Sequence, residues 1–244
     1  MAKKEKLPTM QVPERIIRIV RSNYPRPSKL SDPGGDFSPE ELEAILRKPN
    51  ADLTEVDLMA IFQGALPAGE YRESVHFLPC ALDHILRGDE ETTLCGNLFR
   101  WMQGERDKLR RDALFDELLE CFEAFFAELV SRFLLNEAGD SPLGGDMART
   151  LIESANSPDL GGLGDVWLEK YLGNAETYEQ AAWLVVFLED HLWRILRDSA
   201  YLQRVADDKA LQRKAYEVIL PRALVEEPLL RFWSERFDRC GLGQ

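Results

Sequence analysis

The 244-residue chain lacks the marks of several protein classes. No run approaches the ~18 apolar residues of a membrane-spanning helix, and no signal-peptide apolar block follows the charged N-terminus MAKKEKLPTM. The four cysteines, Cys80, Cys95, Cys121 and Cys240, form no C-x-x-C pair and lie among apolar residues, as small buried hydrophobes do. We therefore expect a soluble, cytoplasmic protein in a reducing compartment, with no membrane partner.

Strand patterns are missing too, because apolar and polar residues never alternate over five or more positions. Helix start signals are present instead. In SPEELEAILRK, Ser38 is a predicted N-cap, Pro39 suits the first turn, and Glu41 completes a capping box. Thr54 and Asp57 repeat the capping pattern before the next apolar run.

The longest periodic run is ERDKLRRDALFDELLECFEAFFAELVSRFLLNEAG, in residues 105–139. Its apolar residues recur at steps of three or four, which predicts a helix of about thirty residues and about 45 Å. The sequence therefore predicts an all-α, multi-helix, bundle-like fold with one long central helix.

Three segments follow from the breaks in this pattern. Residues 1–37 form a basic N-terminal arm with a short helix and a Pro/Gly-rich linker, residues 38–140 a first helical half, and residues 141–244 a second half packed on the first. Sliding the chain along itself until Tyr71 meets Tyr178 also aligns Asp83 with Asp190 and His84 with His191. If the halves are duplicates, residues 38–140 and 145–244 share one helix order.

The net charge of −13 is unevenly distributed. Residues 1–30 carry +6 and the rest of the chain carries −19, which argues against general nucleic-acid binding by the body. We expect no nucleic-acid partner except through the arm, whose basic residues include Lys3, Lys4, Lys6, Arg15, Arg18 and Arg21. We expect the arm to lie on its own acidic body; a separate acidic partner is the alternative.

Two of the three histidines lie in YRESVHFLPCALDHIL, where His76, Cys80 and His84 are spaced four apart. On a helix, residues eight apart are about 12 Å from each other, too far for one zinc ion to bind both ends. Pro79 also predicts a bend. We therefore predict a partly buried, hydrogen-bonded helix face, with no metal and no cofactor.

A metal-dependent hydrolase is the enzymatic alternative. Glu73, His76, His84 and His191 are its fallback ligands, and they would have to converge in space. The Glu73-x-x-His76 step occurs in di-iron bundles, but Leu188 stands where a second glutamate would precede His191. No serine lies in a G-x-S-x-G context, so the sequence nominates no catalytic residue.

Four tryptophans recur at helical spacing in the C-terminal half: Trp167, Trp183, Trp193 and Trp233. Core packing is the expected role, with Trp183 and Trp193 on nearly the same side of one helix. An exposed aromatic anchor at an interface is the alternative.

These features favour a non-enzymatic protein-binding module whose acidic surface contacts a basic protein. In size and charge the chain is similar to compact acidic helical proteins that neutralise bacterial toxins, so an immunity or antitoxin-type inhibitor is the concrete hypothesis. The candidate binding carboxylates are Glu117, Glu120, Glu128, Asp89, Glu90 and Glu91. A helical adaptor subunit is a further alternative.

Overall fold

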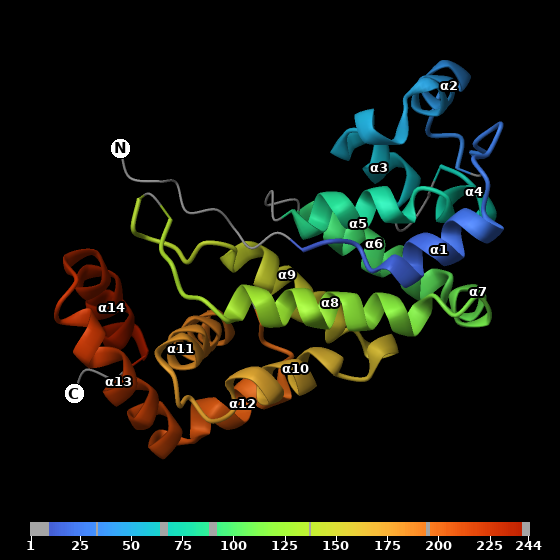
Figure 1. The fold of residues 1–244 in the computed structure, drawn as a ribbon. Helices are drawn as coiled ribbons and strands as arrows, with labels where there is room; N and C mark the ends of the chain where they lie inside the picture. Colours follow the sequence, from blue (N-terminus) through green and yellow to red (C-terminus); the bar gives the residue numbers. More distant parts are fainter. Residues whose placement is uncertain are drawn as a thin grey trace. The chain divides into compact units, whose positions relative to one another are not determined.

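The computed structural model describes residues 10–32, 34–63, 68–87, 92–136, 138–193 and 196–240. Within these ranges the chain forms 14 α-helices, two 3₁₀ helices and no β-strand, so the predicted all-α fold is confirmed (Figure 1). The chain divides into two compact units, residues 1–125 and 126–244. The division falls inside α8, which at 16 residues is the longest of the described helices.

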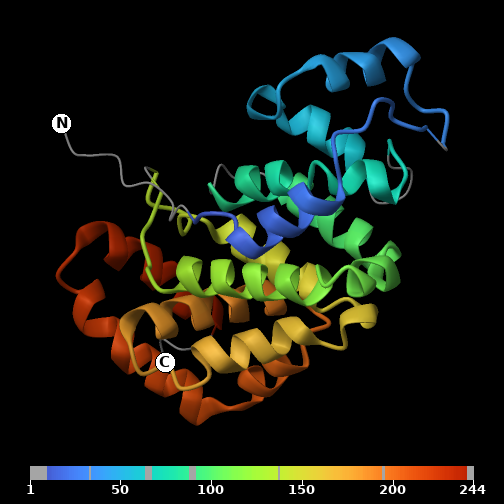
Figure 2. The same ribbon diagram turned by 45° about the vertical axis from the view of Figure 1, so that its right-hand side comes forward.

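Unit 1 contains the helices from α1 to α7 and the first part of α8. Their bounds, with the 3₁₀ helix η1, are α1 (Glu14–Asn23), α2 (Pro39–Arg47), η1 (Asn50–Asp52), α3 (Glu55–Ile61), α4 (Tyr71–Val75), α5 (Leu78–Leu86), α6 (Thr92–Gly104), α7 (Arg106–Arg111) and α8 (Phe115–Val130). Helix α5 contacts α1, α3 and α6, and Figure 2 shows α1 running beside it. Ile16 and Val20 are the buried residues of α1.

The predicted start signals of α2 and α3 are confirmed. Ser38 Oγ accepts a hydrogen bond from Glu41 N at 3.2 Å, while the Glu41 carboxylate accepts one from Ser38 N at 2.7 Å. Thr54 and Asp57 make the same reciprocal pair at the start of α3. Each box satisfies two N–H groups that the helix itself leaves unpaired.

The helix predicted over residues 105–139 is two helices, α7 and α8. Ala113 adopts a left-handed conformation with φ 56°, and its N–H donates to Arg110 O at 3.1 Å. Leu114 N donates to Leu109 O at 2.9 Å, and both leucines are buried. This is a Schellman motif, which ends a helix and usually has glycine at the left-handed position. The alanine conceals the signal in the sequence.

Asp112, in the same turn, also fixes the end of α7. Its carboxylate accepts hydrogen bonds from the hydroxyls of both Tyr24 and Tyr71. Burial, followed by the hydrogen bond to Asp112, raises the pKa of each tyrosine. The turn therefore joins three parts of unit 1 that are far apart in sequence.

Unit 2 contains the end of α8 and the helices from α9 to α14. Their bounds are α9 (Gly145–Ala155), η2 (Pro158–Leu160), α10 (Leu163–Leu172), α11 (Tyr178–Leu192), α12 (Ala200–Asp207), α13 (Lys209–Ala223) and α14 (Glu227–Cys240). Helix α11 contacts α10, α12, α13 and α14, and every residue from Ala181 to His191 is buried. From Ala181 to Leu188 the helix is apolar on every side, as expected of a helix surrounded by others.

Three consecutive polar residues at the end of α11 each bond to a different segment. Glu189 pairs with Arg236 of α14 at 3.0 Å. Asp190 accepts two hydrogen bonds from Arg149 of α9, both at 3.0 Å. His191 Nδ1 donates to Leu196 O at 2.9 Å. Buried polar groups need such partners, so these contacts fix the rotation of α11 against its neighbours.

The helix order recurs in the alignment that pairs Tyr71 with Tyr178. In this alignment α2 corresponds to α9, η1 to η2, α3 to α10, α4 and α5 together to α11, α6 to α12, α7 to part of α13, and α8 to α14. Capping boxes also recur, with Glu70 and Glu73 matching Thr177 and Gln180. This recurrence supports an internal duplication and matches the helix order that it predicts.

The tryptophans divide between core and surface. Trp167, Trp183 and Trp233 are buried, as expected, but Trp193 is 66% exposed. Helix α11 ends at Leu192, so Trp193 is its C-cap and does not continue the buried face of Trp183.

Two tryptophans of α11, one inside the helix and one at its C-cap, provide a matched test of this packing. Trp183 is 0% exposed, stacks on Phe187 with ring centroids 5.5 Å apart, and donates from Nε1 to Arg132 O at 2.7 Å. We expect Trp183→Ala to lower the free energy of unfolding by about 3–5 kcal/mol, measured by urea denaturation. Trp193→Ala, the control, should change it by less than about 0.5 kcal/mol. Equal losses would contradict the packing of α11.

Candidate functional site

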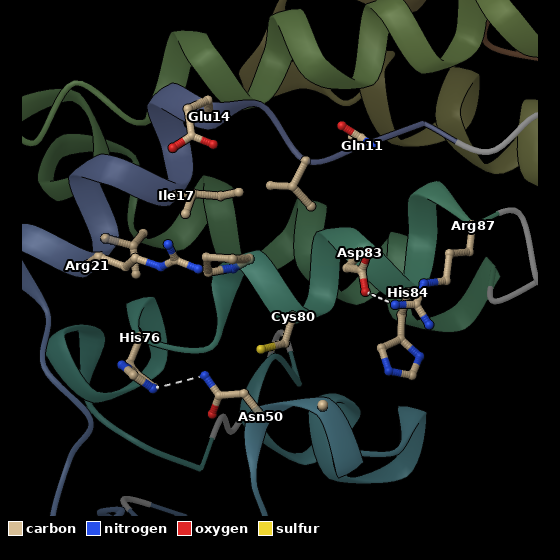
Figure 3. Close-up of a pocket in the computed structure, with 14 residues that line it drawn as sticks. Gln11, Glu14, Ile17, Arg21, Asn50, His76, Cys80, Asp83, His84 and Arg87 are labelled. Carbon is tan, nitrogen blue, oxygen red and sulfur yellow. Dashed lines mark hydrogen bonds and ion pairs between the residues drawn. The ribbon is translucent and has the colours of Figure 1, made fainter.

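A groove of about 510 Å³ lies in unit 1 over one face of α5 (Figure 3). One wall is the segment that leads into α1 and α1 itself, the other is η1, and α5 with the residues before it forms the floor. We call it the α1–α5 groove. The floor carries His76, Cys80 and His84, so the helix face identified in the sequence lines the groove.

The chain through this face is not one continuous helix. Helix α4 ends at Val75 with His76 as its C-cap, and α5 begins at Leu78 with Pro79 in its first turn. Proline suits that position because its missing N–H would be unpaired there. The backbone of His76 stays helical, at φ −52° and ψ −38°, so the three side chains still face one side.

His76 is held as a neutral imidazole with a fixed tautomer. Its Nδ1 lies 3.0 Å from Tyr24 O, and a carbonyl only accepts, so Nδ1 carries the proton. Its Nε2 then accepts from the Asn50 amide at 3.3 Å. Burial lowers the pKa of His76, although the Tyr24 carbonyl acts in the opposite direction, and nearby Arg26 lowers it further.

His84 is fixed in the opposite tautomer. Its Nε2 lies 3.0 Å from Leu53 O and therefore donates to it. In the neutral ring Nδ1 is the acceptor. The two imidazoles therefore differ in which ring nitrogen bonds to the main chain.

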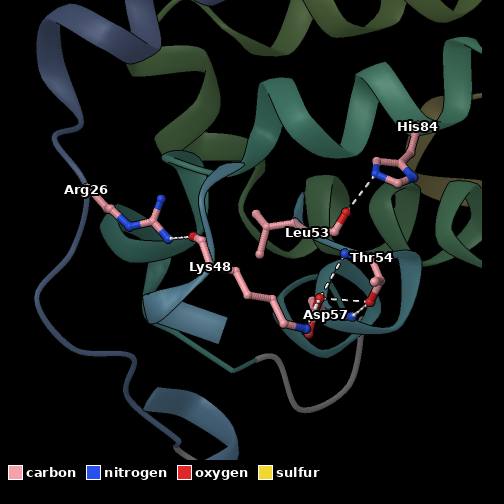
Figure 4. A network of polar contacts seen from close by, with 6 residues as sticks. All are labelled: Arg26, Lys48, Leu53, Thr54, Asp57 and His84. Atoms are coloured by element: carbon pink, nitrogen blue, oxygen red, sulfur yellow. Dashed lines mark hydrogen bonds and ion pairs between the residues drawn. The ribbon is translucent and has the colours of Figure 1, made fainter. Parts of the chain in front are cut away.

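Polar contacts from the α2–α3 connection hold the η1 wall in place (Figure 4). Arg26 donates to Leu46 O at 3.0 Å and also to Lys48 O and the Asn50 side chain. Lys48 Nζ in turn donates to both carboxylate oxygens of Asp57, at 2.8 and 2.7 Å. These contacts fix the position of Asn50 opposite His76.

Cys80 lies between His76 and His84 and is partly exposed. The pKa of its thiol is raised to about 11, first by burial and second by Asp83, while Arg26 acts in the opposite direction. The thiol form dominates at neutral pH, which makes Cys80 a poor nucleophile. The arrangement is therefore suited to binding by shape and hydrogen bonding.

Charged side chains line opposite ends of the groove. Asp83 and Arg87, an ion pair on α5, lie at the end where Gln11 and His84 are found (Figure 3). Arg21, in the last turn of α1, lies at the His76 end. Glu14 of α1 also lines the groove, so α1 and α5 each contribute one anionic and one cationic side chain to it.

The other fallback ligands lie elsewhere. Glu73 accepts hydrogen bonds from Ser31 N at 2.8 Å and Glu70 N at 3.0 Å, which places it in a helix cap. His191 belongs to unit 2 and bonds through Nε2 to Gln203 at 3.3 Å. Among the described residues no three His, Cys, Asp or Glu side chains are grouped to hold a metal ion.

The candidate binding carboxylates differ in their surroundings. Glu117 pairs with Arg15 of α1, and Glu128 pairs with Arg132 at 3.0 Å. Glu120 is exposed. Asp89, Glu90 and Glu91 lie outside the described residues, as do Lys3, Lys4 and Lys6.

The helical part of the basic arm lies on unit 1. Arg15 makes its ion pair with α8, whereas Arg18 and Arg21 are exposed. This placement agrees with the expectation that the arm contacts its own acidic body.

Asn50 and Arg26 are site residues that sequence reasoning missed. Arg26 lies in an irregular connection, Asn50 begins the short η1 turn, and neither belongs to a motif. Their role depends on contacts 24 to 26 residues away in sequence, to each other and to His76.

Comparison of the chain with protein-family models, curated protein sequences and solved structures gives no match. The helices among the described residues include none with the length and apolar character needed to cross a bilayer. The fold and the candidate site together define an all-α protein with a surface groove whose floor carries polar side chains.

The Lys48–Asp57 ion pair next to the η1 wall of the groove predicts that the stability of the fold decreases at acid pH. Burial acts to raise the pKa of Asp57, but hydrogen bonds from Lys48 and Thr54 outweigh it and hold that pKa below its ordinary value. The pKa of Asp57 is lower in the folded chain than its ordinary value of about 3.9 in the unfolded chain, so the ionised carboxylate stabilises the fold above that pH. This stabilisation is lost as the pH falls and the carboxylate becomes protonated in the folded state as well. We expect Asp57→Asn to cost about 1–3 kcal/mol at pH 7 and to flatten the stability loss between about pH 5 and pH 3.

Urea denaturation across this pH range measures the effect. Exposed Asp52→Asn removes a carboxylate from the same segment and is the control, with the wild-type pH profile expected. An Asp57→Asn profile as steep as wild type would contradict the assignment.

The raised pKa of Cys80 predicts slow alkylation. At pH 8 we expect iodoacetamide to modify Cys80 on the order of a hundredfold more slowly than the same cysteine in urea-unfolded chain, because little thiolate is present. The rate should rise with pH up to about 11. Peptide mass spectrometry follows the residue, and a plateau near the ordinary cysteine pKa of about 8.5 would contradict the burial.

Proposed function

We propose that this protein is a non-enzymatic protein-binding module whose acidic surface contacts a basic protein partner. The observation that carries the proposal is a pair of exposed carboxylates, Asp116 and Glu120, on consecutive turns of α8. Neither makes an ion pair with another described residue. We call this pair the acidic α8 face.

The acidic α8 face has an energetic cost in the free protein. Like charges four residues apart on a helix destabilise it by about 0.2–0.5 kcal/mol. Glu117, between them in sequence, points elsewhere and pairs with Arg15. A cationic partner would offset this repulsion, and the charge of −13 would speed its approach.

The hydrogen bonds of the histidines support a binding function over a catalytic one, because one nitrogen of each ring is occupied by the main chain. All three described imidazoles donate to main-chain carbonyls, of Tyr24, Leu53 and Leu196. An immunity or antitoxin-type inhibitor of a basic toxin is the concrete form of the proposal. Among the described residues we find no contact that specifically supports the adaptor hypothesis or the metal-dependent hydrolase hypothesis.

Charge reversal on α8 tests the proposal. With the basic protein that co-purifies with the chain from its own cells, we expect Glu120→Lys to weaken binding about fivefold at low salt, because one attraction becomes a repulsion. Raising the salt from about 0.05 M to about 0.3 M should weaken wild-type binding more than that of the variant. Isothermal titration calorimetry measures both.

Glu217→Lys is the matched control, since Glu217 is also an exposed glutamate within a helix. It should change the affinity by less than about twofold. Binding that is indifferent to salt and to Glu120→Lys would contradict the proposed acidic interface.

A further inference from the structure

The two units contain one equivalent hydrogen bond that is made by different side chains. In the alignment of the two halves, His76 corresponds to Trp183, and α1 and α8 end at equivalent positions. Trp183 Nε1 donates to Arg132 O, just after α8, at 2.7 Å. His76 Nδ1 donates to Tyr24 O, just after α1, at 3.0 Å. Indole has only this one nitrogen, whereas imidazole has a second nitrogen that can take up a proton. Unit 1 therefore has a titratable side chain at this position and unit 2 does not.

The second nitrogen of His76 belongs to a series of hydrogen bonds in which the role of each group is fixed (Figure 3). Arg26 donates to Asn50 Oδ1, so the amide nitrogen of Asn50 is the atom that faces His76 Nε2, at 3.3 Å. A guanidinium and an amide nitrogen both donate, so Nε2 must accept. All of these bonds can form together only while His76 is neutral.

Protonation of His76 makes Nε2 a donor that faces the amide donor of Asn50. Rotating the amide by 180° does not restore the bonds, because its nitrogen would then face Arg26. Arg26 is held in place by its bonds to Leu46 O and Lys48 O, and its guanidinium repels an imidazolium. Asn50 therefore stays with Arg26, and its contact with His76 is the one that breaks.

The other histidine of the groove holds η1 through a bond that protonation leaves intact (Figure 4). His84 Nε2 donates to the carbonyl of Leu53, the C-cap of η1, at 3.0 Å. Uptake of a proton at Nδ1 leaves this donor in place. Thus η1 is bonded to the groove floor through Asn50 at one end and through Leu53 at the other. Of these two bonds, the one at Asn50 depends on the charge of its histidine.

The surroundings of His76 keep its ring neutral at pH 7. Burial lowers the pKa of His76 below its ordinary value of 6.5; the Tyr24 carbonyl raises this pKa, and Arg26 lowers it again. A lowered folded-state pKa means that the neutral ring stabilises the fold above about pH 6.5, and that this contribution is lost as the pH falls. From η1 the groove is lined by Asn50 and Ala51, which carry no charge. The titratable and charged side chains that line it with His76 come from α1 and α5: Glu14, Arg21, Cys80, Asp83, His84 and Arg87.

We propose that the hydrogen bond between His76 and Asn50 is a pH-sensitive latch on the α1–α5 groove. Protonation of His76 breaks this bond, and η1 then moves away from the groove floor at its Asn50 end while Leu53 stays bonded to His84. The groove is therefore more open at acid pH than at pH 7. The latch shares no residue with the acidic α8 face and does not depend on the proposed protein partner.

NMR of the isotope-labelled full chain tests the latch. At pH 7 we expect His76 as the Nδ1–H tautomer and His84 as the Nε2–H tautomer, which the chemical shifts of the ring nitrogens distinguish. His76 should become protonated below pH 6.5, and the side-chain amide signals of Asn50 should move with the same midpoint. An Nε2–H tautomer of His76, or an Asn50 amide that does not respond, overturns the proposal. So does a His76 ring that stays neutral until the chain unfolds.

Removal of the Asn50 amide tests the same coupling from the other partner. Asn50→Ala should raise the midpoint of His76 by about half a pH unit or more, because the bond that favours the neutral ring is gone. Asn23→Ala is the matched control, since Asn23 is an exposed asparagine whose amide donates to Ile19 O within α1. It should leave the midpoint unchanged. Equal midpoints in Asn50→Ala and wild type would contradict the latch.

The accessibility of Cys80, which lies between His76 and His84, measures the opening of the groove. A pyridyl disulfide modifies thiols at acid pH as well, because its leaving thiol is a weak base. Its rate with Cys80, relative to urea-unfolded chain at the same pH, should rise about fivefold as His76 is protonated, the change in open population that loss of one hydrogen bond allows. Peptide mass spectrometry follows the residue. No rise in the wild-type chain overturns the opening.

Two variants that do not titrate complete this test. His76→Gln keeps one donor and one acceptor, and His76→Trp copies Trp183 and keeps a donor. Each should abolish the increase in the Cys80 rate between pH 7 and acid pH. An increase as large as that of wild type in either folded variant would contradict the role of His76. If one variant does not fold, the other decides the question.

Discussion

Burial of one helix among several others is the constraint on which each unit depends. Helix α5 contacts α1, α3 and α6, and α11 contacts α10, α12, α13 and α14. Once such a helix is buried, each polar group on it needs a partner or must face an opening. In α11 the partners are Arg149, Arg236 and a main-chain carbonyl.

The two repeats meet this constraint differently, and the difference produces the candidate site. Helix α11 carries Trp183 and Phe187 and leaves no space on that face. The equivalent positions of unit 1 hold His76 and Cys80, and the groove opens over them. His76 and His84 are then restrained by carbonyl acceptors, so what faces the groove is a set of oriented hydrogen-bonding groups.

Structure can be predicted from the sequence wherever a few neighbouring residues determine it. The capping boxes at Ser38 and Thr54 depend on side chains three positions apart, and both form as predicted. The break after Asp112 is not readable, because its Schellman turn uses Ala113 where glycine would have marked it. Periodicity also places Trp193 inside, although α11 ends one residue earlier.

Sequence alone is enough to predict the helical class, the capped starts at Ser38 and Thr54, and the possibility of a repeat, because periodicity, caps and self-similarity are properties of nearby or directly comparable residues. It also singles out the spacing of His76, Cys80 and His84. That this face is open follows from tertiary packing, since it depends on what α1 and η1 bring against it. Arg26 and Asn50 take part for the same reason: their contacts join segments that the chain order separates.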